Sequence, residues 1–239
     1  MSDPVALVTG ASRGIGEQVA RQLADAGHRV LVTARDLKSA AVVVDSLPGQ
    51  GHRPLRLDVA DAADVDRAAA EVANTEGRLD VLVNNAAAYV DWNEAASSAD
   101  VDAAHAVMET NLFGPWHLMQ AFLPLLQQSP HPRLVNVASG AGSHGDEQFG
   151  LTRRGGKAAS YGISKAALLA LTSTLAAELD GSNVLVNAVC PGLTATWPGA
   201  EAMGARPLPD GAASVVWAAT LPDDGPHGGF FRNGHPVPW

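Results

Sequence analysis

Two side chains suited to acid–base chemistry stand four residues apart in the segment Ser160-Tyr-Gly-Ile-Ser-Lys165. Residues at this spacing lie on one face of a helix, so we expect the Tyr161 phenol and the Lys165 ammonium to be neighbours. A nearby positive charge favours tyrosinate and lowers the phenol pKa from its ordinary value of about 10. The spacing therefore predicts Tyr161 as a general acid or base near neutral pH, although a surface pair on an amphipathic helix would look the same.

Two more polar residues, Ser139 and Asn111, are candidates for the same site. Ser139 follows the apolar run 133–137, which is typical of a buried strand. The carboxyl ends of strands in an open parallel sheet carry ligand sites, so the Ser139 hydroxyl is expected to meet a substrate oxygen. Asn111 lies inside an apolar helical stretch, where it either bends the helix, holds a water molecule or is a satisfied core amide.

A glycine-rich turn, Thr9-Gly-Ala-Ser-Arg-Gly-Ile-Gly16, comes directly after the first apolar run. A pyrophosphate needs close approach of the backbone, free N–H groups and the positive end of a helix dipole, and glycines remove the Cβ atoms that would block it. The position between strand and helix favours a dinucleotide site over a ligand-free turn. The cofactor-binding residues predicted here are Gly10, Ser12, Arg13, Gly14, Ile15 and Gly16.

The end of the second strand indicates which dinucleotide binds. An acidic residue at this point would bind a ribose 2′-hydroxyl and repel a 2′-phosphate, but the strand ends in Ala34-Arg35. The guanidiniums of Arg35 and Arg13 are suited to grip a phosphate, which favours NADPH over NADH. The alternative is that Arg35 forms a surface ion pair with Asp36.

Short β-rich apolar runs alternate with helical periodicity along the whole chain. Strands are expected at 5–8, 29–33, 54–58, 79–83, 133–137, 183–189 and 228–231, with helices at 17–26, 36–47, 62–73, 99–127, 160–179 and near 212. This alternation predicts an α/β fold: a single Rossmann-type doubly wound parallel sheet of about seven strands with helices on both faces. We expect one domain over 1–239, with substrate loops at about 140–160 and 191–211.

Composition narrows the class of protein. The chain of 239 residues has a net charge of −9 and no cluster of basic residues, which argues against nucleic acid and anionic membranes as partners. Cys190 is the one cysteine, and the histidines lack metal-ligand spacing, so no metal site is predicted. No apolar run is long enough to span a bilayer and no signal peptide is apparent, so a reducing, cytoplasmic location is expected.

The motifs described above occur together with others along nearly the entire chain. The others are Leu57-Asp58-Val59, Asn84-Asn85-Ala86 and Pro191-Gly192. In this order and spacing, the sequence resembles the classical type of the short-chain dehydrogenase/reductase family. The segment Thr33-Ala-Arg-Asp36 and the ending 228–239 look like the carbonyl-reductase branch of that family.

The resemblance implies a role for each matching residue. Tyr161 would donate and accept the proton, Ser139 would orient and polarise the carbonyl, and Lys165 would bind the nicotinamide ribose. Asn111 would hold the water of a proton relay. The resemblance further implies cofactor contacts by Asp58, Val59, Asn85, Tyr161, Lys165, Pro191, Gly192, Thr194 and Thr196.

The activity implied is transfer of a hydride from NADPH to a ketone or aldehyde, with a small carbonyl compound as substrate. An NAD(P)⁺-dependent alcohol dehydrogenase and a non-catalytic dinucleotide-binding protein on the same fold are the alternatives. The identity of the substrate, and whether the protein is a monomer or a homo-oligomer, are left open. Trp92, Trp197 and Trp239 either line the substrate cleft or serve packing.

Three features depart from the family pattern. Ala87 stands where the family has glycine, which adds a Cβ near the cofactor. The interval between Ser139 and Tyr161 exceeds the family's usual dozen or so residues. The segment between Gly192 and the helix near Ala212 is short, so substrate-covering helices are expected to be short or absent.

Overall fold

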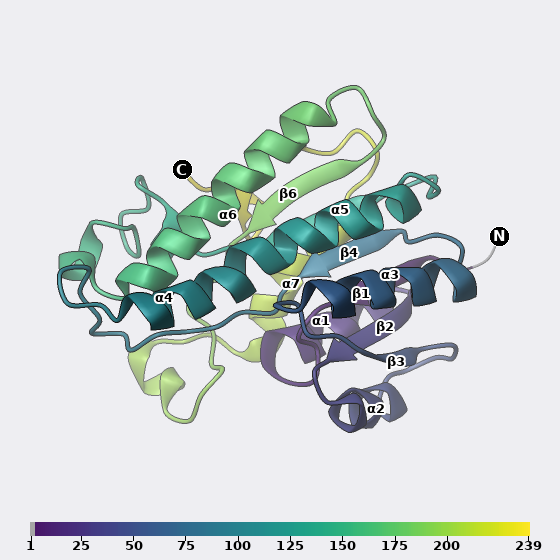
Figure 1. Ribbon diagram of the computed structural model, residues 1–239, viewed down its shortest axis with the longest axis horizontal. Coiled ribbons are helices and arrows are strands. Elements are labelled where there is room, and N and C mark those ends of the chain that lie inside the picture. The colour runs from purple at the N-terminus through teal and green to yellow at the C-terminus, as the bar shows by residue number, and fades with distance from the viewer. Residues whose placement is uncertain (1–2) are drawn as a thin grey trace.

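An eight-stranded sheet runs through the centre of the computed structural model, which describes residues 3–239 (Figure 1). Its order is β3-β2-β1-β4-β5-β6-β7-β8, with parallel pairing throughout except between β7 and β8. The strands are β1 (Val5–Val8), β2 (Arg29–Ala34), β3 (Arg53–Arg56), β4 (Val81–Asn84), β5 (Arg133–Val137), β6 (Leu185–Val189), β7 (Phe230–Arg232) and β8 (His235–Pro236). The predicted α/β sheet of about seven strands is confirmed, and β8 is the short addition.

Helices cover both faces of the sheet. Helices α3 (Ala62–Thr75), α5 (Gly114–Leu126) and α6 (Ala159–Glu178) lie in front of it in Figure 1, while α1 (Gly14–Asp25), α2 (Leu37–Asp45) and α7 (Leu208–Ala219) lie behind. Each face has its own apolar core. Phe122 and Leu168 are buried in the front core, and Val19 and Val215 in the rear core. The apolar stripes of the helices and the continuously apolar strands therefore produce this three-layer packing.

The helical stretch expected over 99–127 contains a change of winding. Helix α4 (Val101–Met108) passes into a π-helix, η1 (Glu109–Phe113), and then into α5. A Cβ at Gly114 would lie 2.6 Å from the carbonyl oxygen of Val59, so this close approach requires glycine. The π-helix thus ends directly before Gly114-Pro115. Helix α5 continues through Pro124 without a break.

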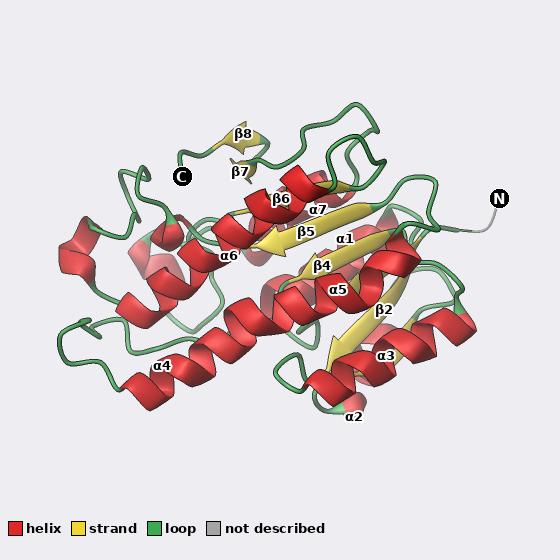
Figure 2. Ribbon diagram, turned by 45° about the horizontal axis from the view of Figure 1, so that its top comes forward, coloured by secondary structure: helices red, strands yellow, loops and turns green. Residues whose placement is uncertain are grey.

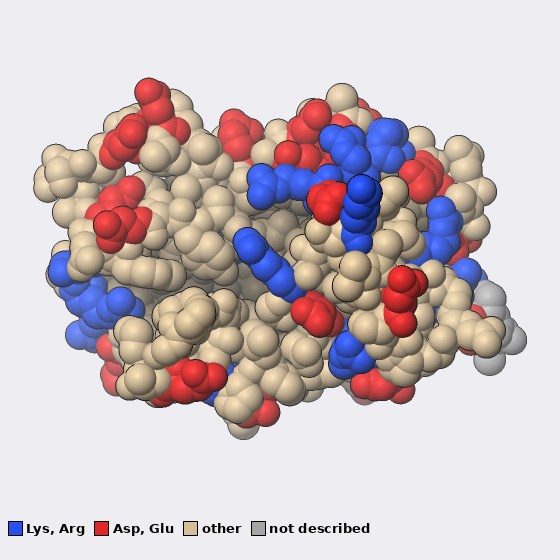
Figure 3. All heavy atoms as spheres, turned by 90° about the horizontal axis from the view of Figure 1, so that it is seen from below, with Lys and Arg blue, Asp and Glu red and all other residues tan. Residues whose placement is uncertain are grey.

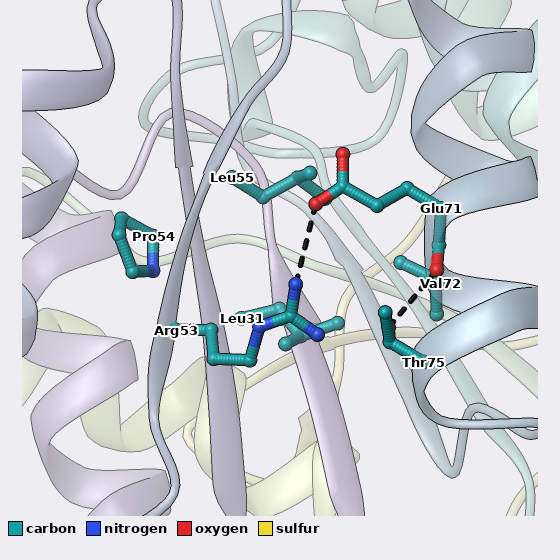
Figure 4. Close-up of a pocket in the computed structure, with 7 residues that line it drawn as sticks. All are labelled: Leu31, Arg53, Pro54, Leu55, Glu71, Val72 and Thr75. Carbon is teal, nitrogen blue, oxygen red and sulfur yellow. Dashed lines mark hydrogen bonds and ion pairs between the residues drawn. The ribbon is translucent and has the colours of Figure 1, made fainter.

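The outer edge of the sheet is fastened to α3 by ion pairs. Arg53 of β3 contacts the carboxylates of Glu71 at 3.3 Å and Glu76 at 3.1 Å. A shallow surface pocket lies at this edge, and Figure 4 shows Arg53 and Glu71 joined across it. The ion pair between Arg53 and Glu71 spans this pocket, which lies away from the carboxyl ends of the central strands.

The segment 140–160 packs against the C-terminal strands. Asp146 forms an ion pair with Arg232 of β7, and the Ser143 hydroxyl donates to the carbonyl of Pro238. The segment between Gly192 and α7 contains one short helical turn, η4 (Ala200–Met203), which agrees with the expectation that helices in this segment are short, while its role in covering a substrate stays a prediction. Within residues 3–239, no helix combines the length and the apolar character that crossing a membrane requires.

Candidate active site

The strand order reverses between β1 and β4. From β1 the chain continues to β2 and β3 on one side, and from β4 it continues to β5 and β6 on the other side. A crevice forms at the carboxyl ends of the strands at such a point. Figure 2 shows β4 and β5 pointing toward the end of the molecule where the N-terminus of α6 and several loops gather. In Figure 3, the molecule is hollowed on one face, and the walls of the hollow are mostly uncharged.

Ser139 and Tyr161 meet at this end. Ser139 comes two residues after β5, and Tyr161 is in the first turn of α6. The Ser139 hydroxyl is close enough to the Tyr161 phenol to act on its pKa, and the Ser139 oxygen accepts from the backbone N–H of Ala141 at 3.2 Å. Tyr161 is 7% exposed. Two hydroxyl groups able to contact one substrate oxygen are therefore adjacent in a mostly buried setting.

Lys165 lies one helical turn beyond Tyr161, on the same face of α6. Its Nζ atom donates to the backbone carbonyl of Val137 at 2.8 Å and lies 5.8 Å from the centre of the Tyr161 ring. Burial, which leaves 2% of the residue exposed, disfavours the ammonium and lowers the pKa of Lys165 to about 8. The predicted proximity of the two side chains is thus present.

The predicted lowering of the pKa of Tyr161 is not found. Burial raises it above the usual value for a phenol, the nearby Tyr89 raises it further, and the hydrogen bond with Ser139 opposes the rise only in part. The prediction was based on the charge of Lys165 alone, whereas desolvation of the buried phenol is the largest cause of the shift. In this structure, Tyr161 is accordingly protonated at neutral pH.

Asn111 is fully buried in the π-helix, where its side-chain amide joins three segments. Its Nδ2 donates to the carbonyl of Ala88 at 2.9 Å and to the hydroxyl of Ser164 at 3.0 Å, and its Oδ1 accepts from the N–H of Ala88 at 2.7 Å. Of the three alternatives, the satisfied amide and the irregular helix both occur. The role in a water relay stays a prediction.

The glycine loop has the shape of a nucleotide cradle. Gly10 and Gly14 have positive φ angles of 61° and 62°, which side chains rarely adopt. A Cβ at Gly16 would lie 2.4 Å from the Nδ2 atom of Asn85. Arg13 provides no side-chain cap for α1, so the first N–H groups of this helix are available to a ligand. These features fit the pyrophosphate of a dinucleotide.

Arg35 is exposed at the end of β2 and forms no ion pair within the described part of the chain. The alternative pairing with Asp36 is wrong, because Asp36 caps α2. Its carboxylate accepts from the N–H groups of Lys38 and Ser39 at 3.2 and 3.1 Å, and from the Ser39 hydroxyl at 2.6 Å. The guanidinium of Arg35 is thereby left for a ligand.

Buried polar contacts hold the turn of Asp58 and Val59, two of the residues for which the resemblance implies cofactor contacts. The N–H of Asp58 donates to Asp64 at 2.7 Å, which fixes the turn that carries Asp58 and Val59. Burial disfavours the charge of Asp64, but hydrogen bonds from the N–H of Asp58 and from Arg67 outweigh it and lower the pKa of Asp64. Asp64 is therefore a supporting residue that its helical position alone did not single out.

Asn85 connects the loop after β4 to the glycine loop. Its Nδ2 donates to the carbonyls of Thr9 and Gly10 at 2.8 and 3.3 Å. The Thr9 hydroxyl accepts from the N–H groups of Asn85 and Ala86 at 2.9 and 3.0 Å. Thr9 belongs to the motif, but its function as this connector was missed.

The segment after β6 returns toward the glycine loop. A Cβ at Gly14 would lie 4.0 Å from the side chain of Thr196, which is exposed. The hydroxyl of Thr194 bonds within its own turn, to the carbonyls of Pro191 and Gly192 at 3.1 and 3.2 Å. Thr196 is therefore better placed than Thr194 to offer its hydroxyl to a ligand.

Two aromatic side chains from the loop after β4 contact Tyr161, and a third, Trp197, contacts one of them. The ring of Tyr89 stacks on Tyr161 at 5.3 Å and 21°, and Trp92 approaches it edge-on at 5.6 Å. Trp197 lies 6.5 Å from Trp92. Trp239 instead packs on Phe230, so two of the three tryptophans considered for the cleft reach it. Tyr89 was missed, although it follows Asn84-Asn85-Ala86 closely in the sequence.

Comparison with known proteins agrees with this geometry. The family model described as short chain dehydrogenase matches residues 4–203. Oxidoreductase UcpA of Salmonella typhimurium is 35% identical over 90% of this chain and 78% of its own length. The rhamnolipids biosynthesis 3-oxoacyl-[acyl-carrier-protein] reductase of Pseudomonas aeruginosa is 37% identical over 79% of this chain and 72% of its own length.

A solved structure resembles the whole molecule. The NADPH-bound carbonyl reductase from chicken fatty liver superimposes with a TM-score of 0.85 at 25% identity, and all of both chains is covered. The Rossmann-type sheet and the match to the family model define the class of protein as an oxidoreductase. The chain belongs to the short-chain dehydrogenase/reductase family.

Proposed function

We propose that the protein is an NADPH-dependent reductase that converts a ketone or an aldehyde to an alcohol. The observation that carries the proposal is the grouping of Ser139, Tyr161 and Lys165 at the end of the sheet where the glycine cradle also opens. A carbonyl oxygen that contacts both hydroxyl groups would be polarised by Ser139 and protonated by Tyr161. When bound, the nicotinamide supplies the hydride that adds to the carbonyl carbon.

Tyr161 is suited to donate the proton that reduction needs. Its phenol is protonated at neutral pH, since burial raises its pKa further above the neutral range. By microscopic reversibility, the same group would accept the proton in the oxidation of an alcohol, so an NAD(P)⁺-dependent alcohol dehydrogenase is the second candidate function. Initial rates of NADPH oxidation and of NADP⁺ reduction distinguish the two.

The remaining residues bind and orient. The N-terminus of α1 and the glycine loop would hold the pyrophosphate, and Arg35 and Arg13 a 2′-phosphate. The Lys165 ammonium is positioned by its hydrogen bond to the backbone carbonyl of Val137 and would bind the nicotinamide ribose.

The test is NADPH oxidation with a panel of ketones, aldehydes and quinones. We expect turnover by the native protein and a loss of about 10²- to 10⁴-fold in kcat for Tyr161→Phe, with the Kd for NADPH nearly unchanged. Ser139→Ala should lose roughly 10²- to 10³-fold. Full activity of Tyr161→Phe would contradict the role, and no oxidation with any compound would favour the non-catalytic alternative.

A further inference from the structure

The aromatic side chains at the site are more exposed than packing requires. Tyr89 is 57%, Trp92 40% and Trp197 37% exposed, and all three come from loops beside Tyr161. Leaving such large apolar surfaces in water is unfavourable, and a contiguous exposed patch of this kind marks a binding site. Because the patch adjoins the proton donor, its ligand is the substrate of the proposed reaction.

The two indole rings form one aromatic wall. Their centres lie 6.5 Å apart with an interplanar angle of 33°, so the rings contact each other at a tilt. A planar aromatic ring can stack on the exposed part of this wall. A saturated ring is puckered and thicker, so it makes poorer contact with a flat indole face.

Tyr89 offers a further surface for a flat group. Its ring is nearly parallel to that of Tyr161, at 21°, so one flank of the proton donor is already covered by an aromatic face. None of Tyr89, Trp92 and Trp197 carries a charge at neutral pH. The site therefore selects by shape and by the π-face of the ligand, more than by a charged tail.

On this basis, and resting on the reductase function proposed above, we infer that the substrate is a carbonyl compound bearing a planar aromatic ring. The ring packs on the indoles of Trp92 and Trp197, with Tyr89 beside the reacting end. In the reaction, the carbonyl carbon gains a hydride from NADPH and the oxygen gains a proton from Tyr161, which yields the alcohol and NADP⁺. The aromatic ring itself is unchanged.

The experiment compares 4-phenyl-2-butanone with 4-cyclohexyl-2-butanone. The two ketones share the same carbonyl environment, and the saturated compound is the more hydrophobic, so only the flat π-face can favour the phenyl compound. We expect the native protein to prefer the phenyl ketone by roughly tenfold or more in kcat/KM, mostly through KM. Trp92→Leu and Trp197→Leu should each reduce this preference to less than about threefold.

Two further variants isolate the stacking contribution. Trp92→Phe retains an aromatic face and should restore most of the preference. Trp239→Leu is the matched control, because its ring packs on Phe230 outside the aromatic group at Tyr161, and it should behave as the native protein. All variants should keep the native Kd for NADPH.

The failure of this inference differs from the failure of the proposed function. Equal kcat/KM for the two ketones, or faster reduction of the saturated ketone or of a saturated 3-oxoacyl thioester, overturns the aromatic assignment and leaves the reductase function intact. An unchanged preference in both leucine variants also overturns it. A protein that binds NADPH but reduces no carbonyl compound contradicts both.

Discussion

The Glu94 carboxylate accepts hydrogen bonds from the backbone N–H and the hydroxyl of Ser160, at 2.7 and 3.0 Å. Helix α6 has no side-chain cap of its own, since Ala158 stands at its N-cap in a left-handed conformation. Glu94 supplies this cap from the loop after β4, and its charge also suits the positive end of the helix dipole. The loop that carries Trp92 is thus fastened to the helix that carries Tyr161.

Removal of this contact should loosen both loop and helix. For Glu94→Ala, we expect the free energy of unfolding to fall by about 1–2 kcal/mol, as for other lost caps. Because Ser160 precedes Tyr161, kcat for carbonyl reduction should fall as well. Urea unfolding and steady-state kinetics measure these effects. Glu147→Ala, which alters an exposed carboxylate, is the control and should change neither; native stability of Glu94→Ala would refute the cap.

Arg35→Asp should change the choice of cofactor. Loss of a guanidinium–phosphate contact should raise KM for NADPH about 10- to 100-fold, while KM for NADH changes little or falls, since a carboxylate here can bind a ribose hydroxyl. Kinetics with both cofactors and one carbonyl substrate measure the ratio. Arg153→Asp makes the same charge change on the segment 140–160 and should leave the ratio unaltered. Equal effects of Arg35→Asp on both cofactors would end the NADPH assignment.

The buried ammonium of Lys165 should lower the free energy of unfolding, although the proposed reaction requires this residue. Its pKa is about 8 in the folded protein, against 10.5 for a solvent-exposed lysine, so the folded state binds fewer protons than the unfolded chain between these pH values. The penalty is full below about pH 8 and disappears as pH rises through this window. It amounts to about 3 kcal/mol, offset in part by about 1 kcal/mol for the hydrogen bond to Val137.

Lys165→Met should therefore raise the free energy of unfolding by roughly 1–2 kcal/mol at neutral pH, although it abolishes catalysis. This gain should shrink as the pH is raised toward the ordinary pKa of lysine. Urea unfolding over a series of pH values measures the difference between the two proteins. The exposed Lys38→Met is the control, and a Lys165→Met variant less stable than the native protein at neutral pH would contradict the buried-charge penalty.

Gly16→Ala should distort the nucleotide cradle. Its Cβ would lie 2.4 Å from Asn85 Nδ2 and 2.6 Å from the carbonyl oxygen of Gly10, so one of these must move. We expect a loss of about 1–3 kcal/mol in stability, with weaker NADPH binding. Calorimetric titration measures the binding. Gly27→Ala adds a Cβ in open space at a φ of 84°, so it should cost stability alone; equal NADPH affinity in the two variants would disprove the close contact.

Periodicity predicted the strands and helices that position the site. The helix expected at 160–179 is found at Ala159–Glu178, and the strand expected at 133–137 is found at those residues. These patterns are local, because a helix or strand shows its buried face in its own sequence. The π-helix at Asn111 was not predicted, because it depends on packing between Gly114 and Val59.

The order and types of residues by themselves determined a parallel α/β sheet, a glycine cradle after its first strand, and a serine, a tyrosine and a lysine at one end. The tertiary structure decided how these groups behave. Burial, which depends on distant segments, raises the pKa of Tyr161 where adjacent charge alone predicted a decrease. The cap from Glu94 and the aromatic group around Tyr161 likewise join loops far apart in the chain, so no local pattern could reveal them.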